Sequence, residues 1–288
     1  MSKQLPTPNS QLQLIDTHCH IHEADYPLPI ADVLQRASDA GVGKMICVGT
    51  SEQSSADAIK FAAQYDNIFA SVGVHPHDTK DGWEKIKDLL EDGRWKMEDG
   101  TQQNSANSQI LNSNSKIVAV GEIGLDYFYN HSPREVQIAA LEAQIQIALD
   151  NNLPIIFHVR DAFDDFWPII DNFQSAGQRI RGVLHSFTDV QENLDKAFER
   201  GLYVGINGIS TFTKDPAQQQ MYAAIPLERM LLETDAPFLT PAPYRGTINQ
   251  PAFVSEVAAF HAAIRGIDPS EVASATTANA STLFNLNK

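Results

Sequence analysis

Residues that can bind a metal ion stand at the ends of short apolar runs in this sequence. Five runs close in this way, and the residues are His18 with His20, Glu122, His158, His185 and Asp235. Histidine nitrogens and carboxylate oxygens are the usual ligands of zinc, manganese and related cations. Because the same kind of residue recurs at the same kind of position, we predict one shared metal site.

The first run contains a His-x-His pair whose spacing has a physical reason. Side chains alternate faces along a strand, so His18 and His20 are expected to point into the fold together while Cys19 points outward. Two imidazoles in this arrangement can hold one cation. Two hydrogen-bonded core histidines are the alternative for such a pair alone, but the four further ligand-type residues favour a metal site.

Four imidazoles and two carboxylates suit two divalent cations, such as Zn²⁺, Mn²⁺, Mg²⁺ or a similar ion. Glu122 is the candidate for a carboxylate that bridges both ions and takes part in catalysis. Asp235 is expected to bind one ion and to accept a proton from the attacking water. A cap or an ion pair in the loop before Pro237 is the alternative role of Asp235.

The apolar runs alternate with helical stretches along the chain. Eight strands are predicted, at 14–20, 44–50, 68–74, 117–124, 154–159, 181–187, 202–208 and 230–236. This alternation predicts an α/β fold with parallel strands, and eight of them favour a single-domain (β/α)8 barrel of the TIM type. A doubly wound open sheet is the alternative, but it requires a glycine-rich phosphate loop that we do not find. In such a barrel the ligand-type residues would meet at the carboxyl ends of the strands.

Two helix starts are suggested by local motifs. Ser132 and Glu135 frame a capping box with proline at the first helical position, which predicts a helix from there. Thr188 with Gln191 predicts the start of another helix, and Gly201 is expected to end it in a left-handed conformation.

The chain has 288 residues, of which 43% are hydrophobic, as expected for one large core. We predict a polar N-terminal extension at 1–13 and a hydrolase barrel at 14–288. Within the barrel, 98–116 is rich in Asn, Ser and Gln, which is typical of an inserted, mobile surface loop. No signal peptide or run of ~20 apolar residues is found, and the two cysteines predict no disulfide framework. The expected location is therefore the reducing cytoplasm, without membrane attachment.

The formal net charge is −15, so the surface repels polyanions at long range. A groove that grips long DNA through many phosphates is therefore disfavoured. A phosphate substrate remains compatible, because bound cations can dominate the field inside a pocket.

The motifs, taken in order, resemble the TatD family of metal-dependent deoxyribonucleases. The matching strings are DTHCH at 16–20, VGVHPH at 72–77, GEIGLDY at 121–127, HVRD at 158–161, HSF at 185–187 and ETDAPFLTP at 233–241. The resemblance implies a (β/α)8 barrel that hydrolyses phosphodiester bonds in DNA with two divalent metals. It also implies that one ion is held by His18, His20, Glu122 and Asp235, and the second by Glu122, His158 and His185.

Further residues beside these motifs are candidates for supporting roles. His75, Arg160 and Arg245 are expected to contact a substrate phosphate, and Asp126 is expected to accept a hydrogen bond from a ligand histidine. A structural hydrogen bond is the alternative for His75. An ion pair with a neighbouring carboxylate is the alternative for Arg160.

The sequence departs from the family pattern near the expected mouth of the barrel. TINQP at 247–251 replaces a segment that usually has a basic residue and Asn-Glu-Pro, and Thr188-Asp189 stand where a glycine commonly follows. Both changes make the mouth less positive or more crowded. The expected substrate is a phosphate ester, preferably short or single-stranded DNA. A small-molecule or aminoacyl ester or amide hydrolase using the same two-metal site is the alternative, and no obligate protein partner is expected.

Overall fold

The structure is a computed structural model that describes residues 13–92 and 116–286. Eight parallel strands pair in chain order, so each strand lies beside the one that precedes it. Their bounds are β1 Leu14–Cys19, β2 Val42–Val48, β3 Ile68–Val72, β4 Ile117–Asp126, β5 Ile155–Arg160, β6 Gly182–Leu184, β7 Tyr203–Ile206 and β8 Met230–Leu232. All eight predicted strands are present, although β1, β3, β6, β7 and β8 are shorter than predicted.

The first and last strands meet at their carboxyl ends. The amide of Asp235 donates to the carbonyl of His18 at 2.8 Å, and the amide of His20 donates to the carbonyl of Ala236 at 2.8 Å. Cys19 and Ala236 form a parallel bridge at the same place. These contacts nearly close the sheet, so the predicted (β/α)8 barrel is confirmed.

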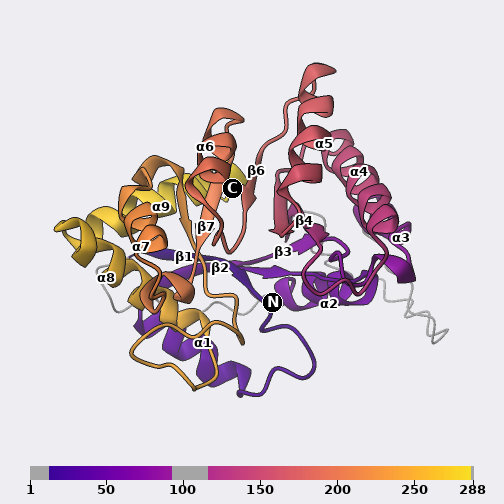
Figure 1. The fold of residues 1–288 in the computed structure, drawn as a ribbon. Helices are drawn as coiled ribbons and strands as arrows, with labels where there is room; N and C mark the ends of the chain where they lie inside the picture. Colours follow the sequence, from indigo (N-terminus) through magenta and orange to yellow (C-terminus); the bar gives the residue numbers. More distant parts are fainter. Residues whose placement is uncertain (1–12, 93–115, 287–288) are drawn as a thin grey trace, which may run out of the picture.

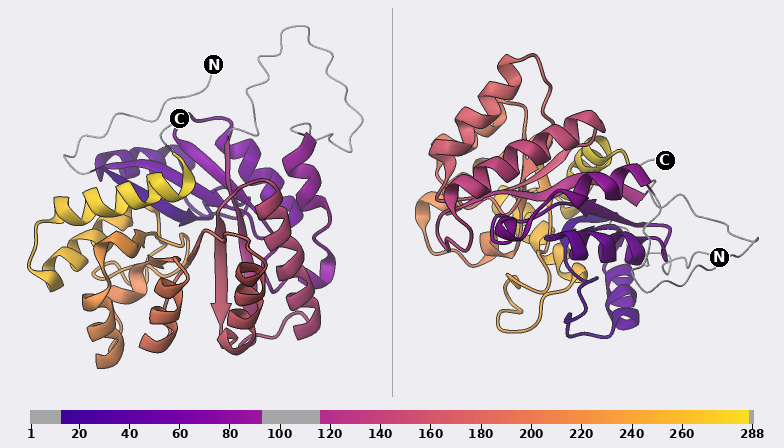
Figure 2. Two further views of the ribbon diagram at one scale, coloured as in Figure 1. Left: turned by 90° about the horizontal axis from the view of Figure 1, so that it is seen from above. Right: turned by 90° about the vertical axis from the view of Figure 1, so that its right-hand side faces the viewer.

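Helices follow the strands and cover the outside of the barrel. Their bounds are α1 Ile30–Asp39, α2 Glu52–Ala62, α3 Lys85–Asp92, α4 Arg134–Asp150, α5 Phe163–Ser175, α6 Gln191–Glu199, α7 Pro216–Ala224, α8 Val254–Arg265 and α9 Pro269–Phe284. Figure 1 shows α3, α4 and α5 on one side of the strands and α7, α8 and α9 on the opposite side, and Figure 2 agrees. Among the described residues, no helix combines the length and apolarity that a membrane crossing requires.

The predicted extension at 1–13 and the predicted insertion at 98–116 lie outside the described residues, except for the last residue of each. Lys116 is attached to the barrel, because its Nζ donates to the carbonyls of Tyr65 and Asp66 at 2.6 and 2.8 Å. Those two residues precede β3, so Lys116 connects the starts of β3 and β4.

The start of α4 differs from the prediction. Ser132 does not cap this helix, because its hydroxyl donates to the carbonyl of His77 at 2.7 Å and accepts the amide of Lys80 at 3.2 Å. The helix begins at Arg134, after Pro133 at the cap position, and no side chain caps it. The predicted capping box is therefore wrong, because Ser132 instead fastens the loop that follows β3.

The start of α6 also differs, whereas its end is as predicted. Val190 rather than Thr188 is the cap residue, and Asp189 Oδ1 accepts its amide at 2.8 Å. Gly201 has a φ of 77° after this helix, so the predicted left-handed end is confirmed.

Apolar side chains fill both the barrel interior and the layer between strands and helices. Ile46 belongs to the interior cluster, together with Leu283 and Phe284 from the end of α9. Cys19 and Cys47 belong to the larger outer cluster and are free, buried thiols. The strands are therefore packed on both faces below the site, which gives the polar residues at their ends a rigid support.

Candidate metal centre

Polar side chains gather at the carboxyl ends of the strands in a group that we call the cup. Its members are His18, His20, His75, Glu122, Asp126, His158, His185, Glu233 and Asp235. All six residues predicted to bind metal are among them.

A bulge in β1 sets the direction of its histidines. Three steps along β1, from Asp16 to Cys19, pair with only two steps along β2. The extra residue interrupts the simple alternation of side chains before His18. Beyond the bulge, His18 and His20 both lie in the cup while Cys19 joins the outer cluster, as predicted.

A second bulge places Glu122. Three steps along β4, from Val120 to Ile123, pair with two steps along β5. Gly121 has a φ of +150° in this bulge, and a Cβ there would lie 2.6 Å from the Cβ of Ile156. Glycine is therefore required beside Glu122, and the bulge directs the carboxylate into the cup, where its side chain is only 4% exposed.

His18, His20 and Asp235 form the first group of potential ligands. The two Nε2 atoms lie 3.1 Å apart, and they lie 3.6 and 3.4 Å from Asp235 Oδ1. Two imidazole nitrogens and one carboxylate oxygen thus converge on one point, as ligands around a cation do.

Glu122 joins this first group to a second one. Its Oε2 lies 3.3 Å from His18 Nε2. Its Oε1 lies 2.8 Å from His158 Nδ1 and 3.0 Å from His185 Nε2. The two oxygens of one carboxylate therefore face different sets of nitrogen atoms, which is the arrangement that a bridging carboxylate needs.

Contacts behind two of the imidazole rings fix which nitrogen faces the other ligand-type residues. His20 Nδ1 lies 2.8 Å from the carbonyl of Val48, which leaves Nε2 for the cup. His158 Nε2 lies 3.0 Å from Asp126 Oδ2, which leaves Nδ1. Asp126 therefore lies behind His158, where an outer hydrogen-bond acceptor is expected.

Glu233 is a member of the cup that the sequence analysis missed. Its carboxylate is 1% exposed, lies 3.2 Å from His185 Nδ1 and accepts the amide of Ser186 at 2.6 Å. With His18 and His185 it forms a further group of potential metal ligands. The available signal was its place directly after β8, two residues before Asp235.

His75 lies inside the cup rather than at the rim. Its Nδ1 accepts the amide of His77 at 3.2 Å, so its Nε2 faces Glu122 Oε1 at 3.4 Å. With Glu122 and His158 it forms another group of potential ligands. His77, which the sequence analysis also missed, lies 3.0 Å from Asp126 Oδ2.

Arg160 and Arg245 are exposed, and each rests on an aromatic ring. The guanidinium of Arg160 lies 4.0 Å from the ring centroid of Phe128, and that of Arg245 lies 3.8 Å from that of Phe212. Arg245 also donates to the carbonyl of Thr240 at 2.7 Å. Within the described ranges neither arginine has an ion pair, so the carboxylate partner considered for Arg160 is absent there.

The charges in the cup depend strongly on one another. Burial alone raises the pKa of the Glu122 carboxyl, but the imidazoles of His185, His75 and His18 outweigh it and hold the pKa well below its usual range. Burial lowers the pKa of His185, but Glu122 and Glu233 outweigh it and raise this pKa well above its usual value. A proton on His185 thus supplies positive charge to Glu122 and Glu233, and a bound cation would replace it.

The residues fit a divalent cation. Imidazole and carboxylate are suitable ligands, and in each group the potential ligand atoms lie within 4.8 Å of one another. His18 Nδ1 is buried without a hydrogen-bond partner among the described residues. Its Nε2 lies close to another imidazole nitrogen and two carboxylates. A cation between the Nε2 atoms of the two histidines and the carboxylate oxygens would accept lone pairs from all of them.

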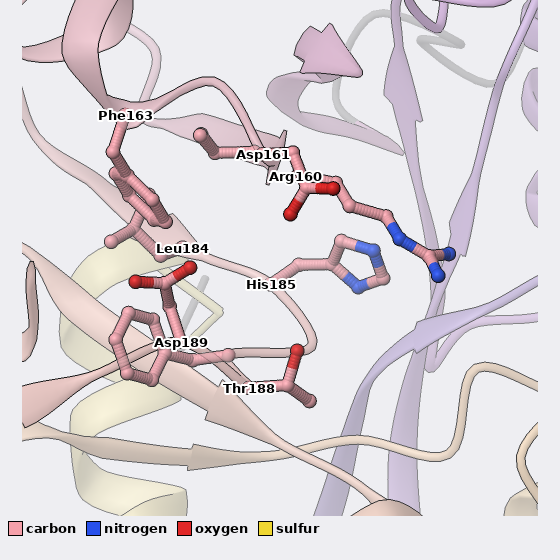
Figure 3. Close-up of a pocket in the computed structure, with 9 residues that line it drawn as sticks. Arg160, Asp161, Phe163, Leu184, His185, Thr188 and Asp189 are labelled. Atoms are coloured by element: carbon pink, nitrogen blue, oxygen red, sulfur yellow. The ribbon is translucent and has the colours of Figure 1, made fainter. Parts of the chain in front are cut away.

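A pocket of about 120 Å³ adjoins the cup between the ends of β5 and β6. Its lining residues are Val159, Arg160, Asp161, Phe163, Leu184, His185, Phe187, Thr188 and Asp189. Figure 3 shows the His185 ring between Arg160 and Thr188. Thr188 and Asp189, which depart from the family pattern, thus form part of the wall beside the cup.

The fold and the cup together define a metal-binding barrel whose potential ligands lie at the usual active-site end. A sequence profile for the family described as TatD related DNase matches residues 15–285. An uncharacterized metal-dependent hydrolase of Bacillus subtilis, YabD, is 34% identical over 274 residues, covering 95% of this chain and 100% of that protein. The 3′-5′ ssDNA/RNA exonuclease TatD of Citrobacter rodentium is 33% identical over 261 residues, covering 88% and 91%.

Solved structures give the same result. The crystal structure of YjjV, a TatD homologue from Escherichia coli, superposes with a TM-score of 0.78 at 30% identity, covering 94% of this chain and 98% of that one. A TatD family hydrolase from Entamoeba histolytica has the same fold, with a TM-score of 0.77 at 21% identity. This chain therefore belongs to the TatD family of metal-dependent hydrolases.

Proposed function

We propose that this protein hydrolyses phosphodiester bonds in short or single-stranded DNA, using two divalent cations held in the cup. The ligands of one ion would be His18, His20, Glu122 and Asp235, and those of the other Glu122, His158 and His185. The observation that carries this proposal is the division of Glu122 between two sets of nitrogen atoms, at 3.3 Å for Oε2 and at 2.8 and 3.0 Å for Oε1.

The substrate class is carried over from relatives that are named for it. The TatD proteins of Citrobacter rodentium and Salmonella typhimurium, which are 33% and 34% identical to this chain, are called exonucleases of single-stranded DNA and RNA. Phosphodiesters also suit the chemistry of a two-metal site, because two ions can stabilise both the attacking and the leaving oxygen of an in-line displacement.

The side chains of the cup would have different roles in hydrolysis. When bound, the divalent cations polarise the phosphoryl oxygens and lower the pKa of the attacking water. Asp235 would accept the proton of this water at a carboxylate oxygen. Its side chain is 14% exposed, whereas that of Glu122 is only 4% exposed, so substrate water reaches Asp235 more readily. Glu233 and Asp126 would hold His185 and His158 in their ligand orientations.

Hydrolysis assays with a defined substrate panel test the proposal. Protein stripped by EDTA and reloaded with Mn²⁺, Zn²⁺ or Mg²⁺ would be given a single-stranded oligodeoxynucleotide, bis(p-nitrophenyl) phosphate and an aminoacyl ester. We expect metal-dependent cleavage of both phosphodiesters. Protein that is left without metal is the control.

Cleavage of the aminoacyl ester alone would contradict the proposal and favour the small-molecule hydrolase. Duplex and single-stranded DNA of one sequence, compared at equal concentration, test the preference for single strands. Equal rates on both would remove that part of the proposal.

A further inference from the structure

Two neighbouring aromatic side chains beside the cup remain exposed. Phe128 and Tyr129 lie two and three residues after the end of β4, and 55% and 51% of their surfaces are accessible. Their rings contact each other edge to face, with centroids 4.8 Å apart. Two exposed rings in contact offer a larger apolar surface to a ligand than a single exposed apolar residue does.

The backbone of this pair is fixed by the same carboxylate that orients His158. Asp126 Oδ1 accepts the amides of Phe128 and Tyr129, each at 3.0 Å. Asp126 Oδ2 lies 3.0 Å from His158 Nε2, and His158 Nδ1 lies 2.8 Å from Glu122. The backbone that carries the two rings therefore has a defined position relative to the cup.

A positive charge lies against the same two rings. The guanidinium of Arg160 lies 4.0 Å from the ring centroid of Phe128 and 4.8 Å from that of Tyr129. Figure 3 shows this side chain extending away from Phe163 and Leu184 on the far side of the pocket. Within the described part of the chain, Arg160 forms no ion pair, so its charge remains available to an anion.

We propose that Phe128, Tyr129 and Arg160 form a subsite that binds one base and an adjacent phosphate of a single-stranded nucleic acid. We call it the aromatic subsite. It rests on the proposed function, since the scissile phosphate of the same strand would lie in the cup. Single-stranded nucleic acid is the occupant that fits, because its bases expose their faces for stacking on aromatic rings while arginine binds the backbone.

The overall charge supports the same occupant. A net charge of −15 disfavours affinity from a long track of phosphates. Stacking of bases on exposed rings supplies affinity that does not depend on net charge. The aromatic subsite would thus contribute affinity for a single strand that the acidic surface does not contribute.

Binding and turnover of separate probes test the subsite. The double variant Phe128→Leu/Tyr129→Leu keeps apolar side chains and removes both rings. Metal-loaded protein would be titrated with a fluorescein-labelled phosphorothioate oligothymidylate, with anisotropy as the readout. We expect the Kd of the variant to rise at least about fivefold, the low end of the loss of one stacked base. Turnover of bis(p-nitrophenyl) phosphate, which is too small to span both sites, should stay within about twofold.

Matched variants separate stacking from other effects. Phe128→Tyr and Tyr129→Phe keep the rings and should bind like the wild type. Ile264→Ala removes an exposed apolar side chain on α8, outside the cup, and should also leave the Kd unchanged. Arg160→Ala should change the slope of log Kd against log salt by about one, whereas Arg160→Lys should retain the wild-type slope.

Oligonucleotides with one abasic position give the decisive measurement. For one abasic position, the Kd of the wild type should rise as much as the Kd of the double variant rises for the intact oligonucleotide. The same abasic position should not raise the Kd of the double variant any further. Additive losses at every position, or an unchanged Kd in the double variant, would overturn the subsite.

A concentration-dependent wild-type dimer that disappears in the double variant would also overturn it, because the rings would then bind a second copy. Failure of the wild type to cleave either phosphodiester would instead contradict the proposed function, and the anisotropy data would still decide whether the subsite exists.

Discussion

Three ligand-type histidines of the cup, His20, His158 and His185, have a contact behind the ring that favours one nitrogen for the cup. The carbonyl of Val48 lies 2.8 Å from His20 Nδ1, Asp126 Oδ2 lies 3.0 Å from His158 Nε2, and Glu233 Oε1 lies 3.2 Å from His185 Nδ1. Such outer contacts reduce the entropy that ligands lose on binding a cation, so the cup is prepared for metal before metal arrives.

The two histidines of β1 provide the most direct test of the metal site. We expect His18→Ala/His20→Ala to lower the number of divalent ions per chain, measured by elemental analysis after gel filtration, because one group loses both nitrogen ligands. His131→Ala, which removes an exposed histidine, is the control and should leave the number unchanged. The far-ultraviolet circular dichroism of both variants should match that of the wild type. Unchanged occupancy in the double variant would contradict the assignment.

Substitutions of Asp235 and Glu122 are expected to affect kcat and metal occupancy differently. Asp235→Asn keeps the volume but loses the base, so kcat should fall by about 10²–10⁴-fold while metal occupancy falls less. Glu122→Gln should reduce occupancy and activity together, because both ions lose a ligand. The measurement is kcat at saturating Mn²⁺ alongside bound metal. Near wild-type turnover by metal-loaded Asp235→Asn would remove this residue from proton transfer.

At the scale of elements, the sequence predicted the strands and the place of the site but not the backbone irregularities that aim its side chains. Apolar runs that end in a residue such as His158 or His185 are a local pattern. This pattern was sufficient to predict the six ligand-type residues that meet in the cup. The bulges before His18 and at Glu122 depend on pairing with strands distant in sequence. Asp235 also adopts a φ of +59°, at the place where its amide joins the end of β1 through the carbonyl of His18. Local patterns contain no information on such pairing.

Gly124 in β4 tests how closely the strands support the site. It has a φ of +155°, and a Cβ there would lie 1.8 Å from the carbonyl oxygen of His158. Gly124→Ala should therefore destabilise the fold by about 2–5 kcal/mol and lower metal occupancy, because the strand carrying His158 must move. Gly177→Ala is the control, since φ is +80° with nothing within 4 Å, and it should cost only about 1–2 kcal/mol. Urea unfolding measures both, and equal losses would contradict this account.

The junction of α8 with the loop after β7 contains a buried histidine away from the cup. Burial, assisted by Arg265, lowers the pKa of His261 to about 3, while its Nε2 lies 3.0 Å from Ser210 Oγ. The unfolded chain then binds the extra proton below its pKa of about 6.5, so stability falls as the pH decreases from about 6.5 towards 3.

His261→Gln removes this proton uptake and should lose less stability between pH 7 and pH 4.5 than the wild type. The difference should be about 2–3 kcal/mol, since about two pH units of linkage are removed. Urea unfolding at both pH values measures it, and all other titrating groups cancel in the comparison. Parallel losses of stability in the two proteins would show that His261 is protonated in the folded state.

For the whole molecule, the balance between an acidic surface and a cationic cup governs how substrates approach. The formal net charge is −15, and the four charges of two divalent ions would change it only to −11. A phosphodiester inside the cup is attracted by the ions, whereas the rest of a long strand is repelled by the surface. Affinity should therefore depend on the length of the strand outside the cup and on the ionic strength that screens this repulsion.

This balance predicts an unusual salt dependence. Between about 10 and 100 mM monovalent salt the Debye length falls from about 30 to about 10 Å, which screens the surface charge more than the contacts inside the cup. We expect kcat/KM for a long single strand to stay level or rise over this range at fixed Mn²⁺, and that for a trinucleotide to change less. Bis(p-nitrophenyl) phosphate, with a single charge, is the control.

Proteins that hold DNA along a basic track instead lose affinity steeply as the salt concentration rises, because they bind by releasing counterions. A fall of about tenfold or more for the long strand would therefore mean that a basic track outside the cup, and not the cup with its aromatic subsite, dominates substrate binding.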